Sequence, residues 1–126
     1  GKNDFTTIVG KYQGKYFNSP NDLVYAKNGD LYFTDPPYGL KKGDNDSLKE
    51  LAFNGVFKLS PSGDLSLVIK DLTRPNGVAI SNDQKTLYVA ISDPKNRRIM
   101  AYDITSEGIE NGRVFFESSL GKQNAE

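Results

Sequence analysis

The chain has 126 residues, 37% of them hydrophobic and 25% charged, which is the range of one ordinary soluble domain. Its 16 basic and 16 acidic residues cancel and the basic ones are scattered, so we expect no nucleic-acid partner and no membrane partner. Cysteine and histidine are absent, which excludes disulfides, Cys-based zinc sites and a histidine general base. No signal or membrane-spanning segment is recognised, and no compartment is assigned.

Runs rich in branched and aromatic residues predict nine short β-strands. In chain order these are residues 5–9, 22–26, 31–34, 55–59, 65–69, 77–80, 86–91, 98–102 and 113–116. Turn-forming residues separate several of them, at 28–30, 61–64, 81–83 and 106–108. Such connections are typical of hairpins, so neighbouring strands should pair antiparallel. Residues 38–54 are predicted to form a loop with at most one helical turn.

The chain repeats itself. "PNDLVYAKNGDLYFTDP" returns as "PNGVAISNDQKTLYVAISDP", and Asn21 and Asn76 open the two copies 55 residues apart. Each copy reads as four antiparallel strands, the pattern of a β-propeller blade. We therefore predict an all-β fold of two four-stranded meanders plus one extra strand. The expected parts are an outer strand of a preceding blade (1–16), a blade (17–72), a second blade (73–120) and a tail (121–126).

Two blades cannot close a propeller, since closure typically takes four to eight. We expect the chain to be part of a longer protein. A small domain that assembles into a ring, and an ordinary β-sandwich, are the alternatives. Uncovered blade faces and strand edges also predict possible self-association.

Two stretches, "SPNDLVYAKNGDLYFTDPPYGL" and "RPNGVAISNDQKTLYVAISDP", together resemble the SMP-30/gluconolactonase family of six-bladed propeller lactonases. The resemblance runs from about residue 8 to about residue 116 and implies a fragment of a six-bladed propeller. The second stretch also resembles strictosidine-synthase-like propellers, whereas the first is closer to gluconolactonases.

Asn21 and Asn76 should face the mouth of the propeller channel, because each ends the link that enters a blade at the axis. Amide oxygens suit Ca²⁺ or Mg²⁺ and, less often, Zn²⁺. Asparagine after proline is also a common turn residue, so a purely structural role is the alternative. The resemblance implies a divalent metal held by Asn21, Asn76, a Glu of the first blade and an Asp opening a later blade. Those last two positions have no counterpart in this sequence, and Ca²⁺ is favoured.

Other polar residues near these positions carry weaker predictions. Asp22 follows the first Asn and could bind a polyol hydroxyl, orient a metal ligand or cap a turn. Tyr38 lies in a loop that the family places near the pocket rim, so it is a substrate-contact candidate. Asp35 and Asp93 are expected to end strands and cap the following turns. Five aromatic residues are predicted to pack between blades: Tyr32, Phe33, Phe57, Tyr88 and Tyr102.

The activity implied by the resemblance is hydrolysis of a sugar-type or other small lactone by metal-activated water. The family's base belongs with the later Asp, so no catalytic residue is assigned in this chain, and the chain by itself is expected to be inactive. The alternatives are a strictosidine-synthase-like propeller without metal and a non-catalytic binding or interaction module.

Overall fold

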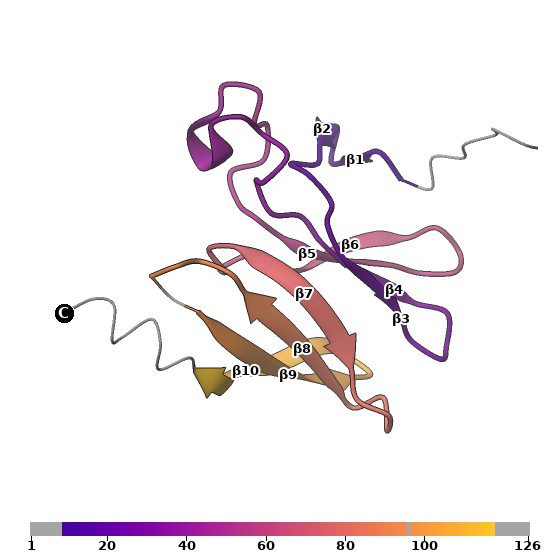
Figure 1. Cartoon of the computed structure of the whole chain (residues 1–126). Coiled ribbons are helices and arrows are strands. Elements are labelled where there is room, and N and C mark those ends of the chain that lie inside the picture. Colours follow the sequence, from indigo (N-terminus) through magenta and orange to yellow (C-terminus); the bar gives the residue numbers. More distant parts are fainter. Residues whose placement is uncertain (1–8, 96, 118–126) are drawn as a thin grey trace, which may run out of the picture.

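The computed structural model describes residues 9–95 and 97–117. Within them the fold is all-β, with two four-stranded antiparallel sheets and one two-stranded hairpin (Figure 1). The helical content of these residues is one 3-10 turn, η1 (Gly43–Asn45), so this part of the chain has no helix that could cross a membrane.

Each sheet is a simple up-and-down meander, as the repeat predicts. The first sheet follows the order β3 (Leu23–Tyr25), β4 (Leu31–Thr34), β5 (Val56–Leu59) and β6 (Leu65–Ile69). The second follows β7 (Pro75–Ile80), β8 (Thr86–Ile91), β9 (Arg98–Thr105) and β10 (Gly108–Glu117). The predicted fold class is therefore confirmed. The predicted loop between β4 and β5 is also observed, and it contains η1.

The strands differ from the prediction at both ends of the chain. A hairpin not foreseen from the sequence joins β1 (Lys11–Tyr12) to β2 (Lys15–Tyr16) through Gln13 and Gly14, whose positive φ angles of 49° and 79° suit a tight two-residue turn. Strand β10 is longer than predicted because irregularities after Glu110 and Val114 let pairing with β9 continue. The strand predicted at 5–9 falls almost wholly outside the described residues.

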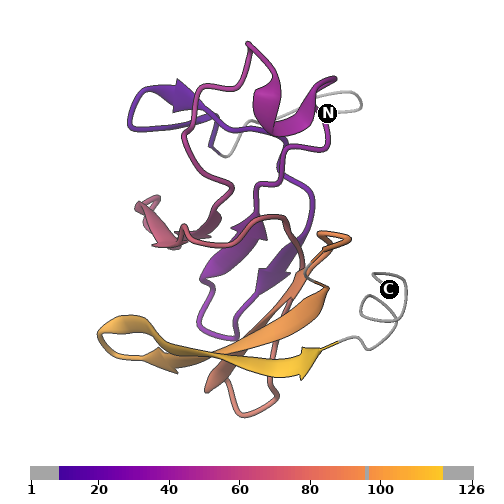
Figure 2. The same ribbon diagram turned by 90° about the vertical axis from the view of Figure 1, so that its left-hand side faces the viewer.

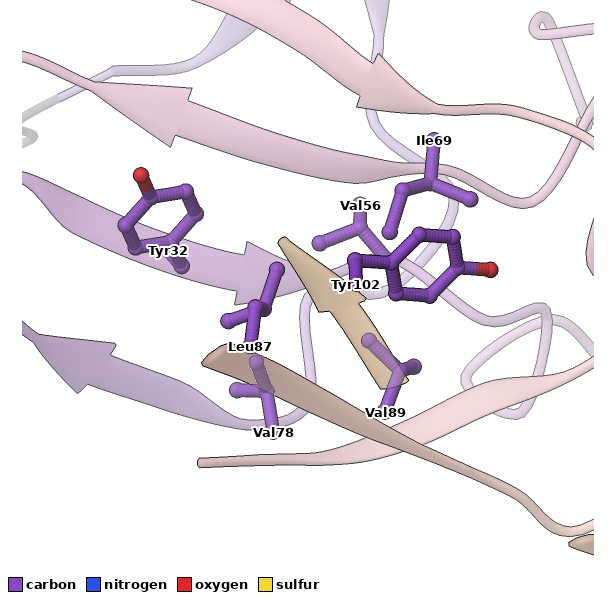
Figure 3. Packing of buried hydrophobic residues seen from close by; sticks show 7 residues of the cluster. All are labelled: Tyr32, Val56, Ile69, Val78, Leu87, Val89 and Tyr102. Carbon is purple, nitrogen blue, oxygen red and sulfur yellow. The ribbon is translucent and has the colours of Figure 1, made fainter. Parts of the chain in front are cut away.

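A shared apolar core joins the two sheets (Figure 3). Strand β7 lies against β3 and β4, so the first strand of the second sheet borders the first two strands of the first. Successive side chains of a strand point to opposite faces of its sheet, so every second side chain lies between the two sheets. The buried members are Tyr32, Val56, Ile69, Val78, Leu87, Val89 and Tyr102.

A second, aromatic core covers the opposite face of the first sheet. Phe57 contacts Phe33, Phe17 and Tyr12 with ring centroids 5.4, 5.0 and 5.2 Å apart. The hairpin and the 3-10 turn lie on this side, away from the second sheet, in both views (Figures 1 and 2). Tyr32 and Tyr102 thus pack between the two blades, as expected. Phe33 and Phe57 face the other way and pack against residues 9–17 and the β4–β5 loop. Because residues 1–16 were expected to belong to a preceding blade, packing of these two rings between blades stays a prediction.

Tyr88, also expected between the blades, contacts Phe115 of its own sheet instead, with ring centroids 5.0 Å apart. Strand β10 is the edge of that sheet. Its residues Val114, Phe115 and Phe116 remain 47%, 63% and 58% exposed. An exposed apolar segment on the edge strand of a sheet favours pairing with another chain.

We therefore expect the chain to self-associate through β10. Replacing Phe115 and Phe116 by lysine should shift sedimentation velocity profiles toward the monomer across a concentration series, because charged side chains disfavour edge pairing. Leu48→Lys is the matched control, since Leu48 is 76% exposed but lies in the loop and should leave the profiles unchanged. A monomeric mass for the unaltered chain at all concentrations would contradict this expectation.

Candidate functional site

Asn21 and Asn76 meet at the start of the two sheets. Asn21 precedes β3 and Asn76 is the second residue of β7. The Asn21 side chain donates a hydrogen bond from Nδ2 to Oδ1 of Asn76 at 2.5 Å, and this contact is exposed. The two blade-opening residues are therefore in contact, as binding of one shared ion would require. We call these two side chains the Asn pair.

The donor chemistry of the Asn pair suits part of the shell of a hard divalent cation. Each amide supplies one neutral oxygen ligand, of the kind found in calcium sites. Asn21 presents its NH2 group to Oδ1 of Asn76, so a cation could replace the hydrogen bond between them once the Asn21 amide is turned to present its oxygen. Among the described residues no three Asp, Glu, His or Cys side chains gather as a metal site. The pair could therefore hold a cation only together with carboxylates from elsewhere.

Asp22 lies directly beside the Asn pair and joins the two sheets. Its Oδ1 accepts a hydrogen bond from the backbone N of Leu23 at 2.9 Å. Its Oδ2 accepts one from the backbone N of Val78, in β7, at 3.0 Å. Both carboxylate oxygens thus already have a backbone partner. The predicted substrate contact would have to use the remaining lone pairs.

Thr34, which the sequence analysis did not single out, also joins the two sheets. Its side chain is fully buried, and Oγ1 donates to the backbone O of Asn76 at 2.6 Å. The same oxygen accepts from the backbone N of Asp22 at 3.2 Å. Within the repeat, Thr34 corresponds to Ser92, one residue before the Asp-Pro of each copy. A hydroxyl side chain at the same position of both copies is the sequence feature that could have pointed to Thr34.

Tyr38 does not contact the Asn pair through any hydrogen bond that the structure shows. Its hydroxyl bonds to Oγ of Ser92, just after β8, so it connects the β4–β5 loop with the second sheet. Partial burial raises the pKa of the phenol, opposed by the charge of Arg74 and reinforced by that of Asp93. The hydroxyl therefore stays protonated at neutral pH and could act as a hydrogen-bond donor at a rim.

Asp35 is not the turn cap that the sequence suggested. Its carboxylate is fully buried and accepts backbone hydrogen bonds from Asn18 and Ser19, both at 2.8 Å. Burial raises the pKa of Asp35 to about 6, against the lowering effect of those two hydrogen bonds and of Lys49. Asp93, in contrast, does cap its turn by accepting from the backbone N of Lys95 at 3.0 Å.

Two buried asparagines, Asn18 and Asn54, extend the hydrogen-bond network around Asp35. The sequence analysis predicted neither of them. Asn18 donates from Nδ2 to the backbone O of Asp35 and of Phe53, each at 3.0 Å. Asn54 donates to the backbone O of Thr73, in the segment that leads to Asn76, at 2.6 Å. This network holds the segment before Asn21, the β4–β5 loop and the segment before Asn76 in one arrangement.

Comparisons with known proteins agree with this architecture. The family model described as "SMP-30/Gluconolactonase/LRE-like region" matches residues 2–125. A gluconolactonase of Zymomonas mobilis is 47% identical over 113 residues, which are 90% of this chain and 32% of that protein. The lactonase drp35 of Staphylococcus saprophyticus is 32% identical over 108 residues, covering 85% of this chain and 29% of that protein.

A solved gluconolactonase structure from Xanthomonas campestris superposes with a TM-score of 0.77 and 40% identity, covering 85% of this chain and 36% of that one. The chain spans about a third of the length of the curated relatives it matches. The two consecutive four-stranded sheets, the converging Asn pair and the match over residues 2–125 lead to one conclusion: this chain belongs to the SMP-30/gluconolactonase/LRE-like family.

Proposed function

We propose that the chain supplies two blades and part of the metal site of a lactone hydrolase acting on a sugar-type or other small lactone. The observation that carries this proposal is the Asn pair, in which the opening residues of successive blades present their amides to each other. The 47% identity to a gluconolactonase supports lactone hydrolysis as the reaction class. Ca²⁺ is the favoured ion, with Mg²⁺ or Zn²⁺ as alternatives, because amide oxygens are hard neutral ligands.

The bound cation would polarise the lactone carbonyl and make water a better nucleophile. The residues of this chain then have definite tasks. Asn21 and Asn76 would hold the cation without neutralising its charge. Tyr38, a residue that is 45% exposed, would exchange the bond of its hydroxyl to Ser92 for one to a substrate hydroxyl, and Asp22 would accept one. We assign no general base to this chain.

Removing either amide should strongly lower the proposed activity. In a longer protein that contains this segment, Asn21→Ala or Asn76→Ala should lower lactone hydrolysis by at least about 10–100-fold, the loss seen when even the outer partners of a metal site are removed. The rate is measured as acid release from δ-gluconolactone in a pH-stat, before and after EDTA and with Ca²⁺ restored. Asn82→Ala, in the turn between β7 and β8, is the control and should retain the rate.

The chain of 126 residues, tested alone, should show no appreciable lactone hydrolysis, since its Asn pair provides only two neutral oxygen ligands for the cation. Robust hydrolysis by the isolated chain would refute the proposed division of the site. Hydrolysis by the longer protein that resists EDTA would refute the metal requirement. A longer protein with no hydrolysis at all would instead favour the non-catalytic binding module.

A further inference from the structure

Strands β3 and β7 start side by side but belong to different sheets, so no backbone ladder connects them. Two side chains bond to the backbone of β7 instead: that of Thr34, the last residue of β4, and that of Asp22, which directly precedes β3. Thr34 Oγ1 donates to the backbone O of Asn76, and Asp22 Oδ2 accepts from the backbone N of Val78. The start of β7 is therefore held on both sides of Gly77.

Thr34 also fixes the first blade's half of the site. Its backbone O accepts from the N of Asn21 at 3.0 Å, and its N donates to the O of Asp22 at 3.0 Å. Oγ1 of the same residue also accepts a hydrogen bond from the backbone N of Asp22. Three atoms of Thr34 thus make hydrogen bonds to the backbone of residues 21 and 22. One buried residue thus contacts the backbone of both Asn residues.

The two copies of the repeat contribute differently to the connection between the sheets. The second copy has Gly77 where the first has Asp22. A Cβ on Gly77 would lie 4.0 Å from Oδ2 of Asp22, so a carboxylate there would place two negative charges together. The first blade provides the side chains of this connection and the second provides backbone atoms.

We propose that Thr34 and Asp22 are positioning residues whose bonds to β7 keep the amides of Asn21 and Asn76 against each other. The chemical purpose of this placement rests on the proposed function. The two Asn residues have no covalent link between them, and they stand at the start of separate sheets, so relative movement of the sheets would separate Nδ2 of Asn21 from Oδ1 of Asn76. Thr34 and Asp22 oppose that movement at residues 76 and 78, on either side of Gly77.

The experiment compares Thr34→Val, Thr34→Ser, Asp22→Asn and Val89→Ala with the unaltered 126-residue chain by NMR. Thr34→Val keeps the shape and removes the hydroxyl, whereas Thr34→Ser keeps the hydroxyl. Val89 is fully buried in the core between the sheets and makes none of these bonds, so Val89→Ala weakens the same interface by packing alone. The first readout needs no metal: the nuclear Overhauser contact between the Asn21 and Asn76 side chains, and the exchange rate of the Val78 amide proton.

We expect Thr34→Val to lose the Asn21–Asn76 contact, and Thr34→Ser and Val89→Ala to keep it. Asp22→Asn should speed exchange of the Val78 amide at least about tenfold, because an amide group has one acceptor oxygen where the carboxylate has two. Retention of both the contact and the slow exchange in Thr34→Val and Asp22→Asn would overturn the proposal. Equal loss in Val89→Ala would also overturn it, because general weakening of the interface would then explain the effect.

The second readout is titration with Mn²⁺, a paramagnetic ion with oxygen-ligand preference, of a longer protein that contains this segment and supplies the remaining ligands. Mn²⁺ should broaden the side-chain signals of the Asn pair, and Thr34→Val should require about 10–100-fold more Mn²⁺, in line with the loss of outer partners at metal sites. If Mn²⁺ broadens neither amide in that longer protein, the proposed metal role fails. The positioning proposal is then still judged by the metal-free contact, so the two failures are distinguishable.

Discussion

Replacing Phe57 by alanine should lower the free energy of unfolding by about 3–5 kcal/mol, the usual cost of truncating a buried phenylalanine. The ring is fully buried and contacts Phe33, Phe17, Tyr12 and Phe53 with centroids 5.0–6.4 Å away. It also fills the space beside Gly55, where a Cβ would lie only 2.8 Å from Cε2 of Phe57. Its removal would leave a cavity bordered by rings from three separate segments of the chain.

Urea unfolding followed by far-UV circular dichroism measures this loss, at one low protein concentration so that association does not contribute. Phe116→Ala is the matched control, since Phe116 is 58% exposed and the same change there should stay within about 0.5 kcal/mol. Phe57→Leu should fall between the two. A loss below about 1 kcal/mol for Phe57→Ala would show that the aromatic core on the outer face of the first sheet is not formed in solution.

The stability of the chain should depend on the ionisation of Asp35. Burial raises the pKa of this carboxyl from 3.8 to about 6, so the folded chain binds its proton more tightly than the unfolded chain does. The contribution of Asp35 is therefore fully present below about pH 4 and is lost as the pH rises through 6. A shift of this size corresponds to roughly 3 kcal/mol.

Asp35→Asn removes this titration and isolates the effect. Unfolding free energies of the unaltered chain and the variant are compared at several pH values between 4 and 8. The stability of the unaltered chain relative to the variant should fall as the pH rises. Asp93→Asn is the control at the other Asp-Pro, where a hydrogen bond from the backbone N of Lys95 lowers the pKa of Asp93 below 3.8, so the stability difference for this variant should stay nearly constant between pH 4 and 8. A constant difference for Asp35→Asn would contradict the prediction.

Local pattern was enough to predict the strands of the two four-stranded sheets and their order. Turn residues between apolar runs define hairpins, and hairpins make neighbours in the chain neighbours in the sheet. The duplicated Pro-Asn opening also placed Asn21 and Asn76 at equivalent points of two units, and the structure brings their side chains within 2.5 Å. The strand order depends on contacts between residues close in sequence, and the equivalence of Asn21 and Asn76 depends on the repeat. Both can be read from the amino-acid sequence.

Only the tertiary structure decided how the units are joined and covered. Asp35 and Asp93 both precede proline, yet one is buried against Asn18 and Ser19 while the other caps an exposed turn. Side chains alternate between the two faces of the first sheet, with Phe33 and Phe57 on one face and Tyr32 and Val56 on the other. The alternation does not tell which of the two faces packs against the second sheet. Thr34 reaches Asn76 across 42 residues. Such contacts arise from the packing of one sheet on the other, which side-chain periodicity alone does not specify, because either face of an apolar strand can be buried.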